Sequence, residues 1–222
     1  MKATHLIFDL DGTLIDSSAG VIEAVNYAYA QVGQTPPDEA TIRKIIGYPL
    51  EQLFREHSDY PERELYDHFQ VHAAESVVGA TVALDGADAT LRALHAQGYI
   101  MGIATTKIRS HVHKILTKLG WEELFDTSIG GDDVRRVKPE PDAFLLAMER
   151  MSTSPSQSIV IGDTENDVLA AKAIPMRVIA VKSPYGGHEK LADMALDHFI
   201  DHLSELLPIL GNGLGDPRGK QK

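Results

Sequence analysis

The feature that most constrains the fold is an alternation of short apolar runs with helix-like stretches after residue 84. The apolar runs cover residues 99–105, 125–131, 158–163, 177–182 and 195–201. The stretches between and after them have the apolar spacing of helices. Strands that alternate with helices are typical of a parallel sheet covered by helices on both faces. The sequence therefore predicts an α/β fold with a Rossmann-like parallel sheet.

The N-terminal part adds one strand and then a long region without strands. The run THLIFDL, residues 4–10, is short, apolar and followed by a turn, which indicates a buried strand. Helical patterns then follow one another, with prolines near the starts of new helices. We expect a core domain formed by residues 1–16 and 81–210, with a helical cap domain, residues 17–80, inserted into it.

The ends of the predicted cap and of the chain have their own patterns. We expect hinges near Asp16–Ser17 and within residues 80–84, where the chain would enter and leave the cap. Residues 211–222 are rich in glycine and charge, which is typical of a flexible tail.

Composition narrows the class of protein. The 222 residues, 43% of them hydrophobic, suit one domain with a modest insertion. With 21 basic and 32 acidic residues the net charge is −11, which argues against nucleic acids and anionic membranes as partners. Cysteine is absent, so no thiol can act as nucleophile. No signal peptide and no run of about 18 apolar residues occurs, and we expect a cytoplasmic protein.

Carboxylates follow the first predicted strand. In open parallel sheets, ligands bind at the carboxyl ends of the strands. Asp9 and Asp11 are two residues apart, so they point to the same side, and Gly12 allows a sharp turn. Such carboxylates can serve as nucleophile, metal ligand or acid–base catalyst. A turn with solvated aspartates is an equally good explanation of this motif alone.

Three further polar clusters are predicted to lie at the same sheet edge. Thr105 and Thr106 can hold a phosphate oxygen, although a simple strand-to-helix cap also explains them. Asp163 and Asp167 have a spacing that suits a divalent cation, or the ordinary acidic start of a helix. Lys138 is followed by prolines that stiffen the segment leading into a predicted helix, so the direction of the lysine side chain is restricted. A surface lysine is the alternative, because most lysines lie on the surface. Together the four clusters meet the needs of phosphoryl transfer, in which Mg²⁺ and a lysine offset the repulsion between carboxylate and phosphate.

Four motifs in this order resemble those of the haloacid dehalogenase superfamily, within its phosphoglycolate phosphatase-like branch. They are DLDGTL at 9–14, IATTK at 103–107, VKPEPD at 137–142 and GDTEND at 162–167. The resemblance runs from about residue 4 to residue 207, and that branch carries a helical cap after its first motif. The segment IGYPLEQLF resembles the cap loop that faces the substrate, which implies a substrate contact near Gly47.

The resemblance implies roles for the residues of the first motif. Asp9 would be the nucleophile that forms an aspartyl-phosphate, and it would also bind Mg²⁺. Asp11 would protonate the leaving alkoxide and then activate water, and its backbone carbonyl would bind the metal. The second aspartate distinguishes phosphatases and mutases from dehalogenases, so haloacid dehalogenation is excluded.

The other motifs complete the implied site. Thr105 would hold a phosphate oxygen, helped by the backbone N–H of Thr106. Lys138 would neutralise the nucleophile and the phosphate. Asp163 would bind Mg²⁺ directly, and Asp167 would bind it directly or support the ligands from behind.

The function implied is a Mg²⁺-dependent phosphatase acting on a small phosphorylated metabolite, with phosphoglycolate as the first expected substrate. An inorganic pyrophosphatase and a sugar phosphomutase on the same core remain alternatives, as does a non-catalytic binding protein. A phosphonate hydrolase would need a Schiff-base lysine in the cap, where Lys44 is the only lysine. The polar candidates for substrate specificity near the cap loop are Arg43, Lys44, Tyr48 and Arg55.

Overall fold

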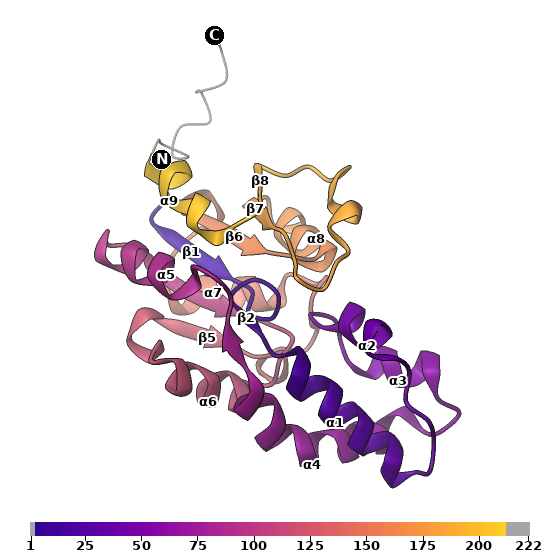
Figure 1. Ribbon diagram of the computed structural model, residues 1–222. Coiled ribbons are helices and arrows are strands. Elements are labelled where there is room, and N and C mark those ends of the chain that lie inside the picture. The colour runs from indigo at the N-terminus through magenta and orange to yellow at the C-terminus, as the bar shows by residue number, and fades with distance from the viewer. Residues whose placement is uncertain (1–2, 212–222) are drawn as a thin grey trace.

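The computed structural model describes residues 3–211 and is built around a six-stranded sheet (Figure 1). Its strands lie in the order β5-β4-β1-β6-β7-β8, and every neighbouring pair is parallel. The strands are β1 (His5–Phe8), β4 (Ile100–Ala104), β5 (Thr127–Ile129), β6 (Ser158–Gly162), β7 (Arg177–Val181) and β8 (His198–Ile200). This topology confirms the predicted α/β class with a Rossmann-like sheet.

Helices cover both faces of the sheet because successive strand residues point to opposite sides. Leu6 and Phe8 pack into one buried cluster with α5, α6 and α9, whereas Ile7 packs into a second with α7 and α8. These helices are α5 (Ala87–Ala96), α6 (Arg109–Leu119), α7 (Asp142–Arg150), α8 (Glu165–Ala173) and α9 (Leu206–Gly211). Short 3₁₀ turns span Glu122–Leu124, Gly131–Asp133, Pro155–Gln157, His188–Leu191 and Leu203–Glu205.

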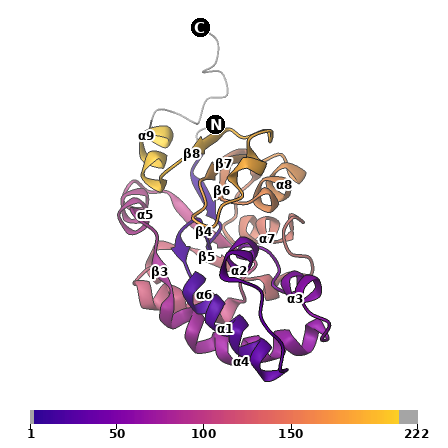
Figure 2. The ribbon, with the colours of Figure 1, turned by 45° about the vertical axis from the view of Figure 1, so that its right-hand side comes forward.

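Four helices between β2 and β3 form a separate layer beyond the carboxyl ends of the strands (Figure 2). They are α1 (Ser18–Gln31), α2 (Glu39–Ile45), α3 (Glu51–His57) and α4 (Glu62–Ala80). Tyr29, Phe54 and Phe69 belong to a third buried cluster that lies mainly within this layer. We call residues 17–80 the cap segment. Its separate movement as a domain stays a prediction.

The two connections of the cap segment to the core pair with each other. Strands β2 (Ile15–Asp16) and β3 (Val82–Ala83) form an antiparallel pair at the predicted hinges. The sequence analysis did not find these strands, because two residues are too few for a periodic pattern. Beside them, Lys118 of α6 donates to backbone carbonyls at the end of α4, which satisfies groups that a helix leaves unpaired there.

Residues 39–80 form three helices, separated at 46–50 and at 58–61, as the prolines near the predicted helix starts indicate. The boundary at the end of the chain differs from the one expected. Gly211, the first residue of the predicted tail, is the last residue of α9, and residues 212–222 lie outside the described residues. Within residues 3–211, no helix is both long enough and apolar enough to cross a membrane. The cytoplasmic location stays a prediction.

We predict that Gly20→Ala destabilises the protein, because α1 and α4 approach each other closely at this glycine. A Cβ atom there would lie 2.3 Å from the carbonyl oxygen of Ser76 and 2.6 Å from the Cα of Val77. Relieving such a backbone clash costs about 1–3 kcal/mol. The free energy of unfolding, measured by urea denaturation, should fall by that amount.

The matched control is Gly79→Ala in α4, where a new Cβ would meet no atom within 4 Å. Alanine is favoured over glycine within helices by up to about 1 kcal/mol, so this variant should be at least as stable as the wild type. Equal losses of stability in the two variants would show that α1 and α4 are not packed as described.

Candidate active site

A buried lysine joins two of the predicted aspartates. Asp9 lies directly after β1, and Asp167 lies in the first turn of α8. The Nζ of Lys138 is 2.6 Å from Oδ1 of Asp9 and 2.6 Å from Oδ1 of Asp167. All three side chains are almost fully inaccessible, with exposed fractions of 2% or less. The structure thus brings Lys138 to the end of β1, as the resemblance implies.

Asp163 reaches the same place from the end of β6, the neighbour of β1. The hydroxyl of Thr13 donates to its Oδ1 over 2.9 Å. Gly12 makes the close approach possible, because a Cβ at this position would lie 2.1 Å from Oδ2 of Asp163. The φ of Gly12 is also +81°, in the left-handed region that favours glycine. Any other residue at position 12 would therefore displace the aspartate.

Asp9, Asp163 and Asp167 form what we call the carboxylate cluster, with one oxygen of each within 4.8 Å of the others. Burial raises the pKa of Asp9 to about 7, although Lys138 acts in the opposite direction. Burial, together with Asp9 and Asp167, also raises the pKa of Asp163 well above its ordinary value. Burial alone would lower the pKa of Lys138, but its two carboxylate partners outweigh that effect and raise it.

Two oxygens of the cluster accept no hydrogen bond from the described residues, namely Oδ2 of Asp9 and Oδ2 of Asp163. A buried carboxylate oxygen without a hydrogen-bond partner destabilises the folded state, and native proteins rarely contain one. Carboxylate oxygens are also the ligands that hard divalent cations prefer. The residues present therefore fit a divalent cation bound between Asp9 and Asp163.

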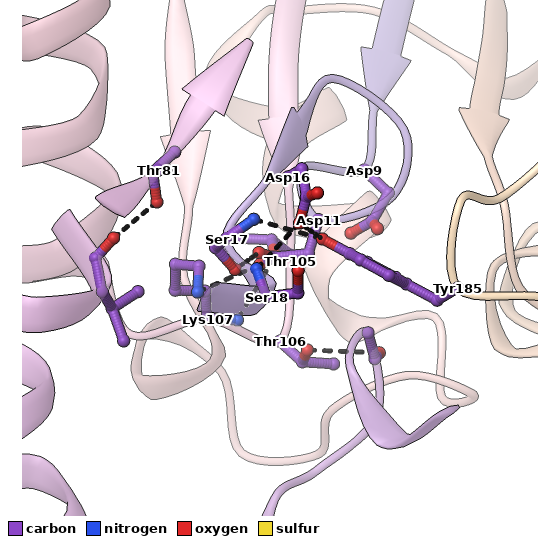
Figure 3. Close-up of polar contacts among 12 residues, drawn as sticks. Asp9, Asp11, Asp16, Ser17, Ser18, Thr81, Thr105, Thr106, Lys107 and Tyr185 are labelled. Atoms are coloured by element: carbon purple, nitrogen blue, oxygen red, sulfur yellow. Dashed lines mark hydrogen bonds and ion pairs between the residues drawn. The ribbon is translucent and has the colours of Figure 1, made fainter. Parts of the chain in front are cut away.

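The carboxylate of Asp11 lies outside this cluster and has partners of its own (Figure 3). The hydroxyl of Ser17 donates to its Oδ1, and the Nζ of Lys107 is 3.1 Å from its Oδ2. Asp9 and Asp11, two residues apart, thus have different electrostatic surroundings. Asp11 contacts the ammonium of Lys107 and a hydroxyl, whereas Asp9 contacts the ammonium of Lys138 and lies close to two other carboxylates.

The threonines after β4 lie next to Asp11 and the cap segment. Thr105 is buried, and its hydroxyl accepts a hydrogen bond of 3.2 Å from the backbone N–H of Lys107. The hydroxyl of Thr106 donates to the carbonyl of Gly47 over 3.3 Å (Figure 3). This hydrogen bond joins the end of β4 to the predicted substrate-facing cap loop.

A cavity of about 670 Å³ lies between the cap segment and the core. Of the polar residues predicted near the cap loop, Tyr48 and Arg55 line it. Lys44 lines a smaller cavity of about 380 Å³, and Arg43 donates to the hydroxyl of Ser18. Asp11 lies at the core side of the larger cavity, so a molecule bound there would contact both parts of the chain.

Tyr48 also forms a contact between the cap segment and the core. Its hydroxyl donates to Glu165 at the start of α8. Lys190 contacts the same carboxylate at 2.8 Å and lies 5.5 Å from the centre of the Tyr48 ring. The cap loop is thus held between the ends of β4 and β6.

The sequence analysis gave no role to several residues of the site. They are Thr13, Ser17, Lys107, His111 and Ser183. Lys107 and Ser183 each follow a strand at the carboxyl edge of the sheet, so the rule used for the aspartates could have found them. Thr13 lies in a turn, Ser17 at the N-cap of α1 and His111 on α6, where no periodic signal separates a site residue from a neighbour.

Comparison with known proteins identifies the family. Residues 6–181 match the family described as haloacid dehalogenase-like hydrolase. The chain belongs to this family. A phosphoglycolate phosphatase from Yersinia pestis is 33% identical over 215 residues, which cover 92% of this chain and 91% of that protein. This hydrolase therefore also falls in the phosphoglycolate phosphatase-like branch, and the expectation of a phosphatase is confirmed.

Solved structures support the same assignment. A haloacid dehalogenase-like hydrolase from Streptococcus pneumoniae superposes with a TM-score of 0.86 at 28% identity, covering 93% of this chain and 98% of that one. A structure described as a predicted phosphoglycolate phosphatase from Haemophilus somnus gives 0.82 at 27% identity, covering 94% and 98%. The individual roles of the site residues stay predictions.

We predict that the metal-free enzyme is destabilised by the charge on Asp9, and that Asp9→Asn relieves this. The raised pKa means that folded Asp9 keeps its proton from about pH 4 to about pH 7, whereas unfolded Asp9 loses it. The folded state then binds more protons, so the contribution of Asp9 to stability falls as pH rises through this window. Asparagine mimics the protonated form at every pH.

The measurement is the free energy of unfolding of both proteins in EDTA across that window. The difference between Asp9→Asn and the wild type should grow with pH. Histidine contributions cancel in this difference, including that of His111, whose pKa burial lowers to about 4. A difference that stays constant or shrinks would contradict the assigned electrostatics.

Proposed function

We propose that this hydrolase is a Mg²⁺-dependent phosphatase that hydrolyses phosphoglycolate through an aspartyl-phosphate on Asp9. The observation that carries the proposal is the arrangement at Asp9, where Lys138 holds one carboxylate oxygen and the other accepts no hydrogen bond from the described residues. An aspartate held in this way keeps one oxygen without a hydrogen-bond partner, as a carboxylate that serves a phosphoryl group and a cation requires. The names of the curated relatives support phosphoglycolate as substrate.

Two aspartates divide the chemistry between them. Asp9 attacks phosphorus and becomes phosphorylated, while Lys138 offsets the negative charge of both partners. Asp11 gives its proton to the leaving oxygen, and later takes one from the water that attacks the phosphorylated aspartate. Its contacts to Ser17 and Lys107 hold it at the wall of the cavity, apart from the carboxylate cluster.

The remaining groups bind and orient the phosphate. Thr105, buried beside Asp11 at the sheet edge, would donate its hydroxyl to a phosphate oxygen, with help from the backbone N–H of Thr106. Gly47 lies across from Thr106, so the cap loop closes one side of the cavity. These donors would hold the phosphorus in line with Asp9.

Asp9, Asp163 and the backbone carbonyl of Asp11 would hold the Mg²⁺ ion, which supplies positive charge for the phosphate oxygens. The two oxygens without hydrogen-bond partners belong to the first two of these residues. Asp167 has a different environment, because Lys138 donates to one of its oxygens and Thr164 to the other. This supports a role for Asp167 in positioning Lys138 rather than in binding the metal.

The other functions considered use the same core. A pyrophosphatase or a sugar phosphomutase would need the same nucleophile and cation, and a binding protein would not need them arranged for attack. The arrangement at Asp9 supports catalysis, and the relatives named phosphoglycolate phosphatase support hydrolysis of a monoester.

We predict that Mg²⁺ stabilises the folded enzyme and that Asp163→Asn removes most of this effect. A cation at one hundred times its Kd stabilises by about 2.7 kcal/mol if the unfolded chain does not bind it. The measurement is the melting temperature in EDTA and in increasing Mg²⁺. The control Asp193→Asn removes an exposed acidic group and should keep the full response. An equal Mg²⁺ response in all three proteins would exclude the proposed cation site.

We predict that Asp9→Asn lowers turnover by on the order of a thousand-fold or more, because the nucleophile is lost. The measurement is phosphate release from phosphoglycolate, other small phosphate esters and pyrophosphate, with Mg²⁺ and with EDTA. The exposed variant Glu149→Gln serves as control. Near-normal turnover by Asp9→Asn would contradict the aspartyl-phosphate route, and a preference for pyrophosphate would favour the pyrophosphatase alternative.

A further inference from the structure

We propose that Lys107 is the specificity-determining residue of the site, and that it binds a carboxylate on the carbon next to the ester oxygen of the substrate. The inference rests on the proposed function, because it takes Asp11 as the acid that meets that oxygen. It names the residue that distinguishes a phosphorylated 2-hydroxy acid from a phosphate ester of the same size with an uncharged tail.

The position of Lys107 is the first step of the argument. It directly follows the threonines at the end of β4, and it lines the large cavity together with Asp11 and His111. Its side chain is 10% exposed, and its Nζ lies 3.1 Å from Oδ2 of Asp11. The ammonium is therefore held at the core wall of the cavity, beside the proposed acid (Figure 3).

The two lysines of the site have different surroundings. Lys138 contacts two buried carboxylates, those of Asp9 and Asp167, and so neutralises the charge of the proposed nucleophile. Within residues 3–211, the ammonium of Lys107 contacts one carboxylate, that of Asp11, which leaves it donors to spare. Lys107 is thus placed on the side of the leaving group rather than on the side of the phosphate.

The chemistry of the leaving group is the second step. To protonate the ester oxygen, Asp11 must come within hydrogen-bond reach of it. In phosphoglycolate a single methylene carbon separates that oxygen from the carboxylate. A cation in contact with Asp11 is then within reach of the carboxylate at the same time. Ammonium–carboxylate hydrogen bonds are among the stronger ones in proteins.

Other cations are less well placed. Among the described residues that line the cavity, Arg55 is the only other one with a permanent positive charge. It lies in the cap segment with 65% of its side chain exposed, and its guanidinium already donates to Glu62 at 2.6 and 3.2 Å. His111 lines the cavity next to Lys107 but is neutral at pH 7, because burial lowers its pKa to about 4.

The test compares kcat/KM for phosphoglycolate and for 2-hydroxyethyl phosphate, in which an alcohol replaces the carboxylate. Lys107→Met should lower the phosphoglycolate-to-alcohol ratio by about 10- to 100-fold, the range expected for a lost hydrogen bond to a charged group. Lys107→Arg should keep much of the preference, because the charge remains. Lys114→Met removes a lysine from the exposed side of α6 and should leave the ratio unchanged.

The outcomes separate the inference from the proposed function. If Lys107 serves only to orient Asp11, Lys107→Met slows both substrates equally, and the inference is overturned. A wild-type enzyme that cleaves 2-hydroxyethyl phosphate but not phosphoglycolate also overturns it, while the phosphatase chemistry stands. Release of phosphate from neither substrate in Mg²⁺ overturns the proposed function itself. Melting temperatures of the variants, and the ratio in Lys107→Arg, distinguish lost specificity from misfolding.

Discussion

The site depends on one buried interaction, the contact of the Lys138 ammonium with Asp9 and Asp167. It joins the end of β1, the segment before α7 and the first turn of α8, which lie far apart in the sequence. Desolvating three charged groups is expensive, and loss of the lysine would leave two buried carboxylates facing each other. The surrounding strands and helices must therefore hold these segments in register, and the parallel order β4-β1-β6 does so.

The sequence predicts the sheet edge well and its contacts poorly. Asp9, Thr105 and Asp163 were identified because parallel strands end at a common edge, a rule that needs only the strand boundaries. Which side chains then touch depends on turns and rotamers. The contact of Lys107 with Asp11 and that of Thr13 with Asp163 therefore have no signature in the spacing. The strands β2 and β3 escaped prediction because each has only two residues.

The cap segment is the least predictable part because its polar residues have different partners. Tyr48 contacts Glu165 of the core, Arg55 pairs with Glu62 inside the cap segment, and Arg43 contacts Ser18 at the start of α1. Helical spacing alone does not distinguish the residues that face the cavity from those that do not. Only the tertiary structure shows which of them face the cavity, so a substrate cannot be chosen from the cap sequence.

The hydrogen bonds of Lys118 to the carbonyls of Val78, Gly79 and Thr81 have a mechanical consequence. One end of the longest cap helix is clamped to α6, whose other end begins beside the cavity. If the cap segment moves as predicted, it would swing about this clamp, because lifting it away would break three hydrogen bonds to an ammonium. Such an opening would be a rotation of the cap segment about the contact between α4 and α6. The widest gap would form at the edge farthest from that contact, beside α2 and α3.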